Sequence, residues 1–531
     1  MCLCIFAPSM FERSRIRSII WGFGLPSYLS PGVYVEEVPS GSRPIEGVGT
    51  AVAAFVGFAQ RGPLNKPTLI ANWSQFVATF GEFMAGSYLA HSVYGYFSNG
   101  GGVCYIVRIG AEAAEAPARA ELMSGGEQKV GALTVAAVAA GDAGNSITVE
   151  VVDPSDATAT DSFNLVVKRD SKVEETFENV TLKRGKQNVA TIVNAQSKLI
   201  KLLEATAGVE TVARGAVSLS GGGASKPSAV TSSDYVGDPA ARTGFGGLEA
   251  IDEVTMVSAP DLMAALQAGM IDLEAVKTVQ TAMINHCELM GDRMAILDTP
   301  PTMNVQQVKD WRVNTTGYDS KYATLYWPWV KVLDPPTGKN VMIPPSGLIA
   351  GVWSRNDDTR GVHKAPANEV VRGVVDIELN ISKVEHDLLN PVGINVVRSF
   401  PGKGIKVWGA RTLSSDASWR YVNVRRLFNY LEKSVLNGTD WVVFEPNDPA
   451  LWARIRRTIA AFLVNEWRKG ALFGYTADQA FYVKCDDETN PAESIDAGQV
   501  VCEIGIAPVK PAEFVIFRLS QFSGGTSLVA E

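Results

Sequence analysis

Residues 50–58 of the chain read TAVAAFVGF, an unbroken apolar run of strand length. A strand without a polar face is suited to a sheet that is buried on both sides. Asn72 is placed to cap a short helix that begins at Trp73, and a second helix is expected around residues 88–97. Another apolar strand follows at residues 103–108. This alternation of strands and helices predicts an α/β core.

The composition of the chain changes after Gly110. Residues 111–249 are rich in Ala, Ser, Thr and Gly and contain alternating apolar runs such as residues 146–152. Such alternation is typical of strands with one solvated face. We therefore expect residues 111–249 to form an inserted, exposed and mostly β domain, with one helix at residues 197–204.

The α/β pattern resumes after this insertion. Residues 250–375 are expected to complete the core that residues 50–110 begin, with a helix at residues 273–290 and a strand at residues 294–298. Residues 376–510 are expected to form a C-terminal α/β assembly domain. The predicted fold class is therefore α/β, or more broadly mixed α+β, in a multidomain chain.

A helix with a marked start is predicted at residues 449–469. Asp448 is a favoured N-cap residue, and Pro449 suits the first helical position. One face of this helix is apolar and consists of Leu451, Trp452, Ile455, Ile459, Phe462 and Leu463. Arg454, Arg457 and Arg468 fall on the opposite face. Two interpretations remain open: a solvated basic face, or a face that docks on an acidic partner.

Two short strand-like segments lie near the ends of the chain. Residues 28–38 read YLSPGVYVEEV, and residues 513–521 read EFVIFRLSQ. The first is bounded by Pro and Gly, and the second follows Pro511. Terminal strands of this kind either join their own sheet or pair with an exposed edge on another molecule.

Length and composition restrict the class of protein. A chain of 531 residues with 46% hydrophobic and 20% charged residues is an ordinary folded protein with several domains. Its formal net charge of −8 argues against a nucleic-acid coat. No apolar run approaches the roughly 20 residues that a membrane span needs. Residues 1–27 are expected to be a disordered extension or the product of a start site placed too far upstream.

No catalytic or metal-binding motif is complete. The six cysteines are scattered without a CxxC pair, and we expect reduced thiols. His286-Cys287-Glu288 has the H-x-E form of zinc deaminases, but the PCxxC that would complete the site is missing. The chain also lacks HExxH and G-x-S-x-G motifs. We therefore predict no enzyme activity, no cofactor and no metal site.

The order of these blocks resembles the tail sheath protein family of contractile phage tails and bacterial contractile injection systems. The matching stretches are residues 28–37, 50–63, 80–81, 96–102, 425–441, 448–469 and 511–517. The resemblance covers the chain from about Leu25 to its end and is weaker in the inserted domain. Among its members, the opening of the chain is most similar to phage-tail-like injection systems.

This resemblance implies an assembly mechanism. Sheath subunits stack as six-fold rings around an inner tube, and each extends two arms that add strands to sheets of its neighbours. Residues 28–49 and 511–531 would be these arms here, and their linking strands would be Val33, Tyr34, Val35, Glu36 and Glu37, and Phe514, Val515, Ile516, Phe517, Arg518 and Leu519. Arg454, Arg457 and Arg468 would contact the tube.

The resemblance also implies partners and a mode of action. The partners would be further copies of the chain, the inner tube, the baseplate and terminal cap proteins, without direct contact to nucleic acid or insertion in a membrane. An extended, metastable sheath would form in the bacterial cytoplasm and contract without nucleotide to drive the tube through a target envelope. A capsid or surface-layer subunit is an alternative, and a hydrolase is a third.

Overall fold

The computed structural model describes residues 44–110, 118–123, 131–138, 142–154, 162–183, 185–205, 212–220 and 230–518. The predicted N-terminal linking strand, Val33–Glu37, the extension at residues 1–27 and Leu519 lie outside these residues.

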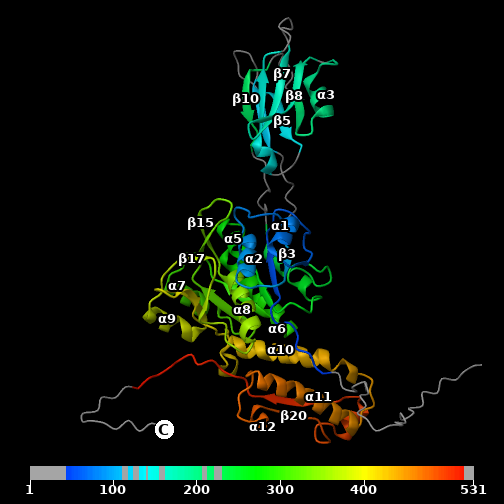
Figure 1. Cartoon of the computed structure of the whole chain (residues 1–531), viewed down its shortest axis with the longest axis vertical. Coiled ribbons are helices and arrows are strands. Elements are labelled where there is room, and N and C mark those ends of the chain that lie inside the picture. The colour runs from blue at the N-terminus through cyan, green and yellow to red at the C-terminus, as the bar shows by residue number, and fades with distance from the viewer. Residues whose placement is uncertain are drawn as a thin grey trace, which may run out of the picture. The chain divides into compact units, whose positions relative to one another are not determined.

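The largest element is a nine-stranded sheet (Figure 1). Its strands, in spatial order, are β16 (Glu369–Val370), β19 (Gly404–Val407), β18 (Ile394–Phe400), β13 (Ala323–Trp327), β12 (Met294–Asp298), β11 (Met256–Ser258), β1 (Ala53–Gly57), β3 (Cys104–Arg108) and β2 (Thr68–Ile70). The strands from β18 to β3 are parallel, whereas β2, β19 and β16 pair antiparallel at the two edges. Parallel order requires crossover connections, which the helices supply.

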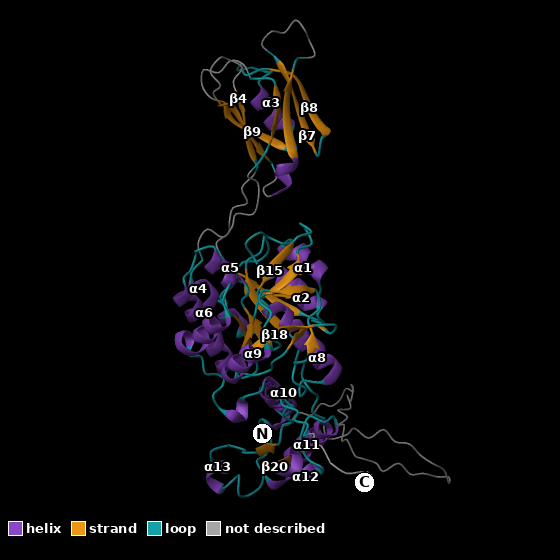
Figure 2. Cartoon of the chain, turned by 90° about the vertical axis from the view of Figure 1, so that its left-hand side faces the viewer, coloured by secondary structure: helices purple, strands orange, loops and turns teal. Residues whose placement is uncertain are grey.

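Helices cover both faces of this sheet, as Figure 2 shows. They are α1 (Trp73–Phe80), α2 (Leu89–Ser98), α4 (Ser232–Val236), α5 (Asp261–Gln267), α6 (Leu273–Met290), α7 (Val305–Asp310), α8 (Ser346–Arg360) and α9 (Lys383–Leu389). All five residues of β1 are buried. Ala54 and Val56 pack in the cluster that holds α5 and α6, whereas Ala53 and Phe55 pack in the cluster that holds α2 and α8. The two-sided burial predicted from residues 50–58 is confirmed.

Glycines permit α2 and α8 to approach closely. A Cβ atom on Gly351 would lie 2.4 Å from the Tyr96 backbone oxygen, and one on Gly347 would lie 2.4 Å from the Ser92 Cβ atom. Two buried carboxylates brace the helix starts around them. Asp261 accepts backbone hydrogen bonds from Phe58, Tyr88 and Leu89, and Asp298 accepts both the N–H and the hydroxyl of Ser346.

Several predicted elements of the core are confirmed. Asn72 caps α1 through its side chain, α6 spans Leu273–Met290, and β12 spans Met294–Asp298. A smaller antiparallel sheet consists of β15 (Asn340–Ile343), β14 (Val330–Leu333) and β17 (Val374–Ile377).

The inserted segment has two sheets and a hydrophobic core of its own, formed by residues 118–219. One sheet has the order β10 (Gly215–Ser218), β6 (Ile147–Val152), β7 (Phe163–Arg169) and β8 (Lys172–Val180); the other has β4 (Arg119–Met123), β5 (Gly131–Ala137) and β9 (Ile200–Ala205). The prediction of a helix at residues 197–204 is wrong. The helix α3 (Val189–Gln196) ends just before this span, and most of the span forms β9. Asn188 caps α3, and Ile200 and Leu202 alternate into the core.

The C-terminal region is mostly helical. It contains α10 (Val422–Gly438), α11 (Pro449–Arg468), α12 (Ala477–Ala480), α13 (Ala492–Asp496) and a two-stranded sheet of β20 (Phe481–Lys484) and β21 (Glu503–Ile506). The predicted start of α11 is confirmed, because the Asp448 side chain accepts a hydrogen bond from the Leu451 N–H. Two predicted domain boundaries differ from the packing. Val230 and Leu248, predicted in the inserted domain, join the main core. Strands β18 and β19, predicted in the C-terminal domain, belong to the main sheet.

Candidate assembly surfaces

The segment that leads to the chain's C-terminal end is fixed to the folded body at Glu513. The Glu513 carboxylate accepts two hydrogen bonds from Arg411, at 2.9 Å and 2.6 Å. Asn390 Nδ2 and the Tyr421 hydroxyl donate to the same carboxylate at 2.7 Å and 3.1 Å. Burial by itself would raise the pKa of Glu513, but the hydrogen bonds from Arg411 and Asn390 outweigh it and hold the pKa below its usual value. The four side chains therefore form a charged clamp, which we call the Glu513 clamp.

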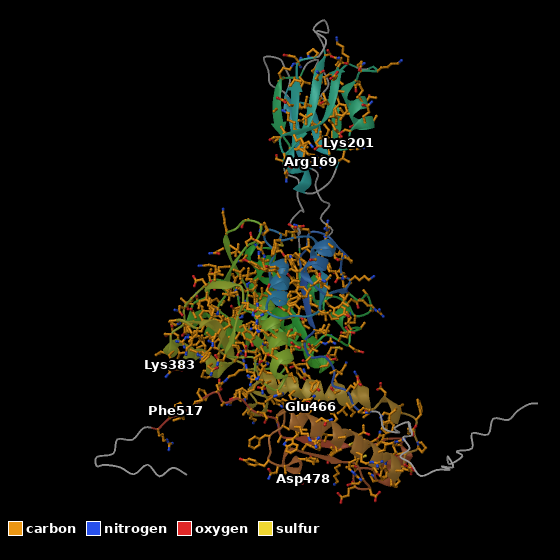
Figure 3. All side chains as sticks on the ribbon, in the orientation of Figure 1. Arg169, Lys201, Lys383, Glu466, Asp478 and Phe517 are labelled. Carbon is orange, nitrogen blue, oxygen red and sulfur yellow. The ribbon has the colours of Figure 1, made fainter. Side chains whose placement is uncertain are left out.

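Directly after the Glu513 clamp, four consecutive apolar side chains are exposed to solvent. The exposed fractions are 72% for Phe514, 68% for Val515, 79% for Ile516 and 84% for Phe517. These residues belong to no strand or helix in the isolated chain, and Figure 3 labels Phe517 among them. Scattered exposed hydrophobic residues are normal, but a contiguous apolar segment marks an interaction site.

The sheet of β20 and β21 has open edges. Its two strands pair antiparallel from Phe481↔Ile506 to Lys484↔Glu503, and no third strand of the described residues joins them. Phe481 and Val483 pack toward the α11 core, whereas Tyr482 is 58% exposed. A two-stranded ribbon is marginal alone, and its free backbone N–H and C=O groups can accept another strand.

The segment that follows the undescribed N-terminal residues is fixed along α10. Ile45 is buried in the C-terminal core, and the Val48 N–H donates to the Ser434 hydroxyl at 3.1 Å. Arg426 donates to the Thr50 carbonyl at 2.8 Å. Both ends of the described chain are therefore held by contacts with the folded body.

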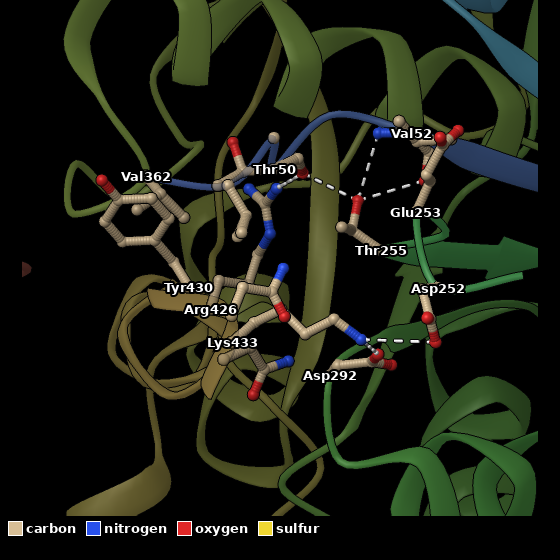
Figure 4. Close-up of a pocket in the computed structure, with 14 residues that line it drawn as sticks. Thr50, Val52, Asp252, Glu253, Thr255, Asp292, Val362, Arg426, Tyr430 and Lys433 are labelled. Atoms are coloured by element: carbon tan, nitrogen blue, oxygen red, sulfur yellow. Dashed lines mark hydrogen bonds and ion pairs between the residues drawn. The ribbon is translucent and has the colours of Figure 1, made fainter. Parts of the chain in front are cut away.

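A cavity of about 400 Å³ lies beside this segment and is lined by residues of α10 and of the loop before β11 (Figure 4). Lys433 reaches across it to Asp292 at 3.0 Å and Asp252 at 3.5 Å. The close-up also shows Thr255 bonded to the backbone of Thr50 and Val52. These contacts join the N-terminal segment, α10 and the core.

A buried ion pair joins α10 to α8. Arg426 donates to both Asp357 oxygens, at 2.9 Å and 2.5 Å, and the two side chains are 4% and 3% exposed. The Arg426 guanidinium also lies 4.7 Å from the ring centre of Trp353. Because an unpaired buried charge is costly, this bidentate contact ties the C-terminal helices to the main sheet.

The three arginines predicted for tube contact lie on α11, but their surroundings differ. Arg454 pairs with Glu445 at 2.6 Å and lies 4.4 Å from the Trp441 ring centre. Arg457 and Arg468 are exposed, and neither forms an ion pair with a described residue. The basic face thus keeps two arginines available and one already engaged within the chain.

The candidate metal motif lies in a packed environment. His286 and Cys287 are buried in α6, and burial with the nearby Arg293 lowers the pKa of His286 to about 4. No group of three or more His, Cys, Asp or Glu residues among the described residues is arranged to hold a metal ion.

The sequence did not reveal the Glu513 clamp. Asn390, Arg411 and Tyr421 are polar residues without a shared motif, and the fold brings them to Glu513 across more than 90 positions. A signal did exist for the exposed segment, because FVIF after Pro511 reads as a strand without an obvious place in the core.

An unpaired sheet edge and an exposed apolar segment are features typical of a structural assembly protein. Family comparison gives the particular family: residues 230–413 match the phage tail sheath protein central domain, and residues 414–522 match the phage tail sheath C-terminal domain. Together these matches span more than half of the chain. The chain therefore belongs to the phage tail sheath family, whose members are structural proteins and not enzymes.

Similar proteins come from several phages and a prophage. A tail sheath protein of Vibrio phage KVP40 is 28% identical over 51% of this chain and 40% of its own length. A putative prophage major tail sheath protein of Pseudomonas aeruginosa is 27% identical over 46% of this chain and 62% of its own length. A tail sheath protein of Burkholderia phage BcepMu is 25% identical over 92% of this chain and 95% of its own length. The chain thus spans less than two thirds of the first two relatives and nearly all of the third.

Solved structures share the fold. The sheath of PVC, an extracellular contractile injection system in its contracted state, has a TM-score of 0.58 at 24% identity, over 94% of this chain and 99% of its own. The contracted helical sheath of the anti-feeding prophage has a TM-score of 0.57 at 23% identity, over 93% of this chain and all of its own. The chain is a structural tail sheath protein of the kind found in phage tails and phage-tail-like particles. Among its described residues, no helix has the length and apolarity to cross a membrane.

Proposed function

We propose that this chain polymerises as stacked six-fold rings around an inner tube, in an extended and metastable sheath that contracts to drive the tube through a target envelope. The two ends of the chain serve as linking arms between subunits. Residues 28–49 form the N-terminal arm, with its strand at Val33–Glu37, and residues 511–531 form the C-terminal arm, with its strand at Phe514–Leu519.

One observation supports this proposal: among the described residues, a two-stranded sheet has no third strand, and an apolar segment is exposed outside any strand or helix. No third strand of the described residues pairs with β20 or β21, and Phe514–Phe517 expose four apolar side chains. The sheet and the segment complement each other, because an added strand satisfies the backbone groups and covers the apolar side chains. We assign β20–β21 as the sheet that receives arms from neighbouring subunits.

The magnitudes suit a permanent link. A donated strand of about six residues adds several backbone hydrogen bonds at about 1 kcal/mol net each. Burial of Phe514, Val515, Ile516 and Phe517 adds about 1.5–3 kcal/mol for each large side chain that becomes fully covered. Two such links per subunit keep neighbours joined while other contacts are exchanged.

Contraction requires that the arms bend and the bodies do not. The Glu513 clamp holds the base of one arm, and the contacts of Ile45, Val48 and Thr50 hold the base of the other. Each body can then turn as a unit about the arm segments that lie beyond these anchors. Larger contacts between subunits in the contracted sheath would supply the free energy, without nucleotide.

The inner tube is proposed to contact the basic face of α11. Arg457 and Arg468 are the principal candidates because they are exposed and without an ion-pair partner among the described residues. Arg454 can contribute only by sharing or exchanging Glu445. Exposed charge contacts are weak individually, which suits a surface that must release the tube on firing.

The further partners in this proposal are the baseplate and terminal cap proteins, and assembly takes place in the bacterial cytoplasm. Membership of the tail sheath family favours this function over a capsid or surface-layer subunit and over a hydrolase.

Electron microscopy of truncated chains tests the proposal. Removal of residues 514–531 leaves the Glu513 clamp intact, so the subunit should stay folded but fail to form long tubes. Removal of residues 28–38 should have the same effect through the other arm. Long, regular tubes from either folded truncation would disprove its arm assignment.

A further inference from the structure

Two cysteines face each other at the end of the β20–β21 ribbon. Cys485 directly follows the last paired residue of β20, and Cys502 directly precedes the first residue of β21. Because Lys484 is paired with Glu503, the next position of the ladder places Cys485 opposite Cys502. The two are 17 positions apart in the sequence, and no spacing motif links them.

Their register position favours a covalent bond between them. The Ala507 N–H donates to the Ala480 carbonyl at 2.8 Å, and hydrogen-bonded pairs recur at every second position of an antiparallel ladder. Cys485 and Cys502 therefore occupy a non-hydrogen-bonded position, where Cα atoms are about 4.5 Å apart and side chains are closest. A disulfide requires a Cα separation of about 4.4–6.8 Å.

The surroundings hold this pair in place and leave one side accessible. Cys485 is fully buried in the C-terminal core, whereas Cys502 is partly exposed. Asn490 bonds to both the N–H and the carbonyl of Val501, at 2.6 Å and 3.0 Å, and its amide lies 3.9 Å from the Cys485 sulfur. Arg456 donates to the Cys485 carbonyl at 2.9 Å. The backbone on both sides of the pair is thus fixed.

We propose that Cys485 and Cys502 form a redox-responsive pair that closes into a disulfide across the β20–β21 ribbon when the protein meets a small-molecule disulfide such as oxidised glutathione. The Cys502 thiolate attacks one sulfur of the oxidant, whose S–S bond breaks and releases one glutathione thiolate. The Cys485 thiolate then attacks the Cys502 sulfur and releases the second. Two protein thiols are oxidised, one glutathione disulfide is reduced, and the two thiol protons end on the released glutathione.

The exchange is expected to be slow. Burial raises the pKa of Cys485, and burial together with the neighbouring thiol raises that of Cys502 to about 12. Since the thiolate is the attacking species, little of it is present near neutral pH. The pair would therefore respond to a lasting change of redox environment and ignore a brief one.

The disulfide would close the loop of residues 486–501 and fix the register of the ribbon. Under the proposed function this ribbon receives the arms, so oxidation would hold the acceptor edge in its binding-competent form. That consequence rests on the proposed function, whereas formation of the bond does not.

The test uses the full chain, unassembled and first reduced. It is incubated for increasing times with oxidised and reduced glutathione in graded ratios, quenched with a maleimide and mapped by mass spectrometry. We expect a cross-linked peptide pair that contains Cys485 and Cys502 and has lost two hydrogen atoms. In Cys485→Ser, Cys502 should instead retain glutathione, and the matched control Cys104→Ser should form the cross-link as the unaltered chain does.

Two results would overturn the proposal. In the first, both cysteines of the folded chain are still recovered as maleimide adducts after an incubation long enough for the urea-unfolded chain to oxidise completely. The other is a cross-link of either cysteine to a different cysteine of the chain. Hydrogen exchange gives a second readout. After oxidation, the backbone amides of β20 and β21 should exchange more slowly in the unaltered chain, whereas their exchange rates in Cys485→Ser should not change. If oxidation leaves these rates unchanged in the unaltered chain as well, the disulfide does not fix the ribbon.

Discussion

Arg411 and Glu513 are 102 positions apart in the sequence and form a bidentate ion pair, at 2.9 Å and 2.6 Å. Their side chains are only 10% and 21% exposed. Glu513 lies one residue before the exposed segment Phe514–Phe517. Under the proposed function, this ion pair fixes the base of the C-terminal arm.

Substitution Glu513→Ala should release this base. Arg411 would be left partly buried without its carboxylate, and loss of charged hydrogen bonds should lower the stability by about 1–3 kcal/mol. The subunit should still fold, but its tubes should be shorter and less regular, because a released segment must be ordered again on docking. Thermal unfolding measures the loss of stability, and electron microscopy measures the length and regularity of the tubes.

The control Asp496→Ala removes an exposed carboxylate and should change neither stability nor tube length. Full-length tubes from a folded Glu513→Ala chain would refute the role of the clamp.

Reversal of charge on α11 should separate tube binding from sheath assembly. The double variant Arg457→Glu/Arg468→Glu should co-assemble several-fold less with the inner tube and still form sheath-only polymers, because these side chains make no ion pair with described residues. Lys201→Glu changes an exposed charge in the inserted domain and is the matched control. Quantitative co-sedimentation with the tube protein is the measurement. If the double variant recruits the tube normally, the basic face of α11 is exposed to solvent and does not contact the tube.

Arg454→Glu should behave differently from the other two arginines. It places a carboxylate against Glu445 and removes a cation from the Trp441 ring, so it should loosen the loop before α11 as well. We expect faster proteolysis between residues 439 and 448 in Arg454→Glu, but not in Arg457→Glu. Equal proteolysis of both variants would argue that the Glu445 contact contributes nothing to the order of that loop.

The ion pair between Arg426 and Asp357 should be costly to break from one side. Asp357→Ala leaves a buried guanidinium without its partner, and we expect a loss of about 3–5 kcal/mol. Arg426→Lys keeps the charge but cannot bond both carboxylate oxygens in one plane, so it should lose less. Denaturant unfolding of both variants checks this order. A smaller loss in Asp357→Ala than in Arg426→Lys would contradict it.

The buried Asp298 should make stability depend on pH. Burial raises its pKa from 3.8 to about 7, against the hydrogen bonds from Ser346 that lower it. A pKa raised on folding favours the protonated form, so the contribution of Asp298 is fully present below about pH 4 and is lost as the pH rises through 7. Asp298→Asn should therefore gain stability relative to the unaltered chain between pH 5 and pH 8, by a few kcal/mol at most. Melting temperatures at both pH values, with Asp478→Asn as an exposed control, measure this difference; a pH-independent difference would count against the raised pKa.

Local pattern was sufficient to predict much of the fold. The two-sided burial of residues 50–58, the Asn72 and Asp448 caps and the full span of α6 were all readable, because each depends on neighbours within a few positions. The helix predicted at residues 197–204 was wrong because the local sequence there is compatible with both a helix and a strand. Pairing of β9 with β5, which the local pattern does not show, selected the strand.

The sequence by itself determined the family and the α/β core, since these are encoded in the order of local segments. The two terminal linking strands stay predictions, because residues 33–37 lie outside the described residues and residues 514–518 form no strand within them. Only the tertiary structure decided which groups meet across long separations: Glu513 with Arg411, Arg426 with Asp357, and Cys485 with Cys502. Such contacts depend on side chains that show no pattern in the sequence, because only sheet pairing and helix packing place them opposite one another.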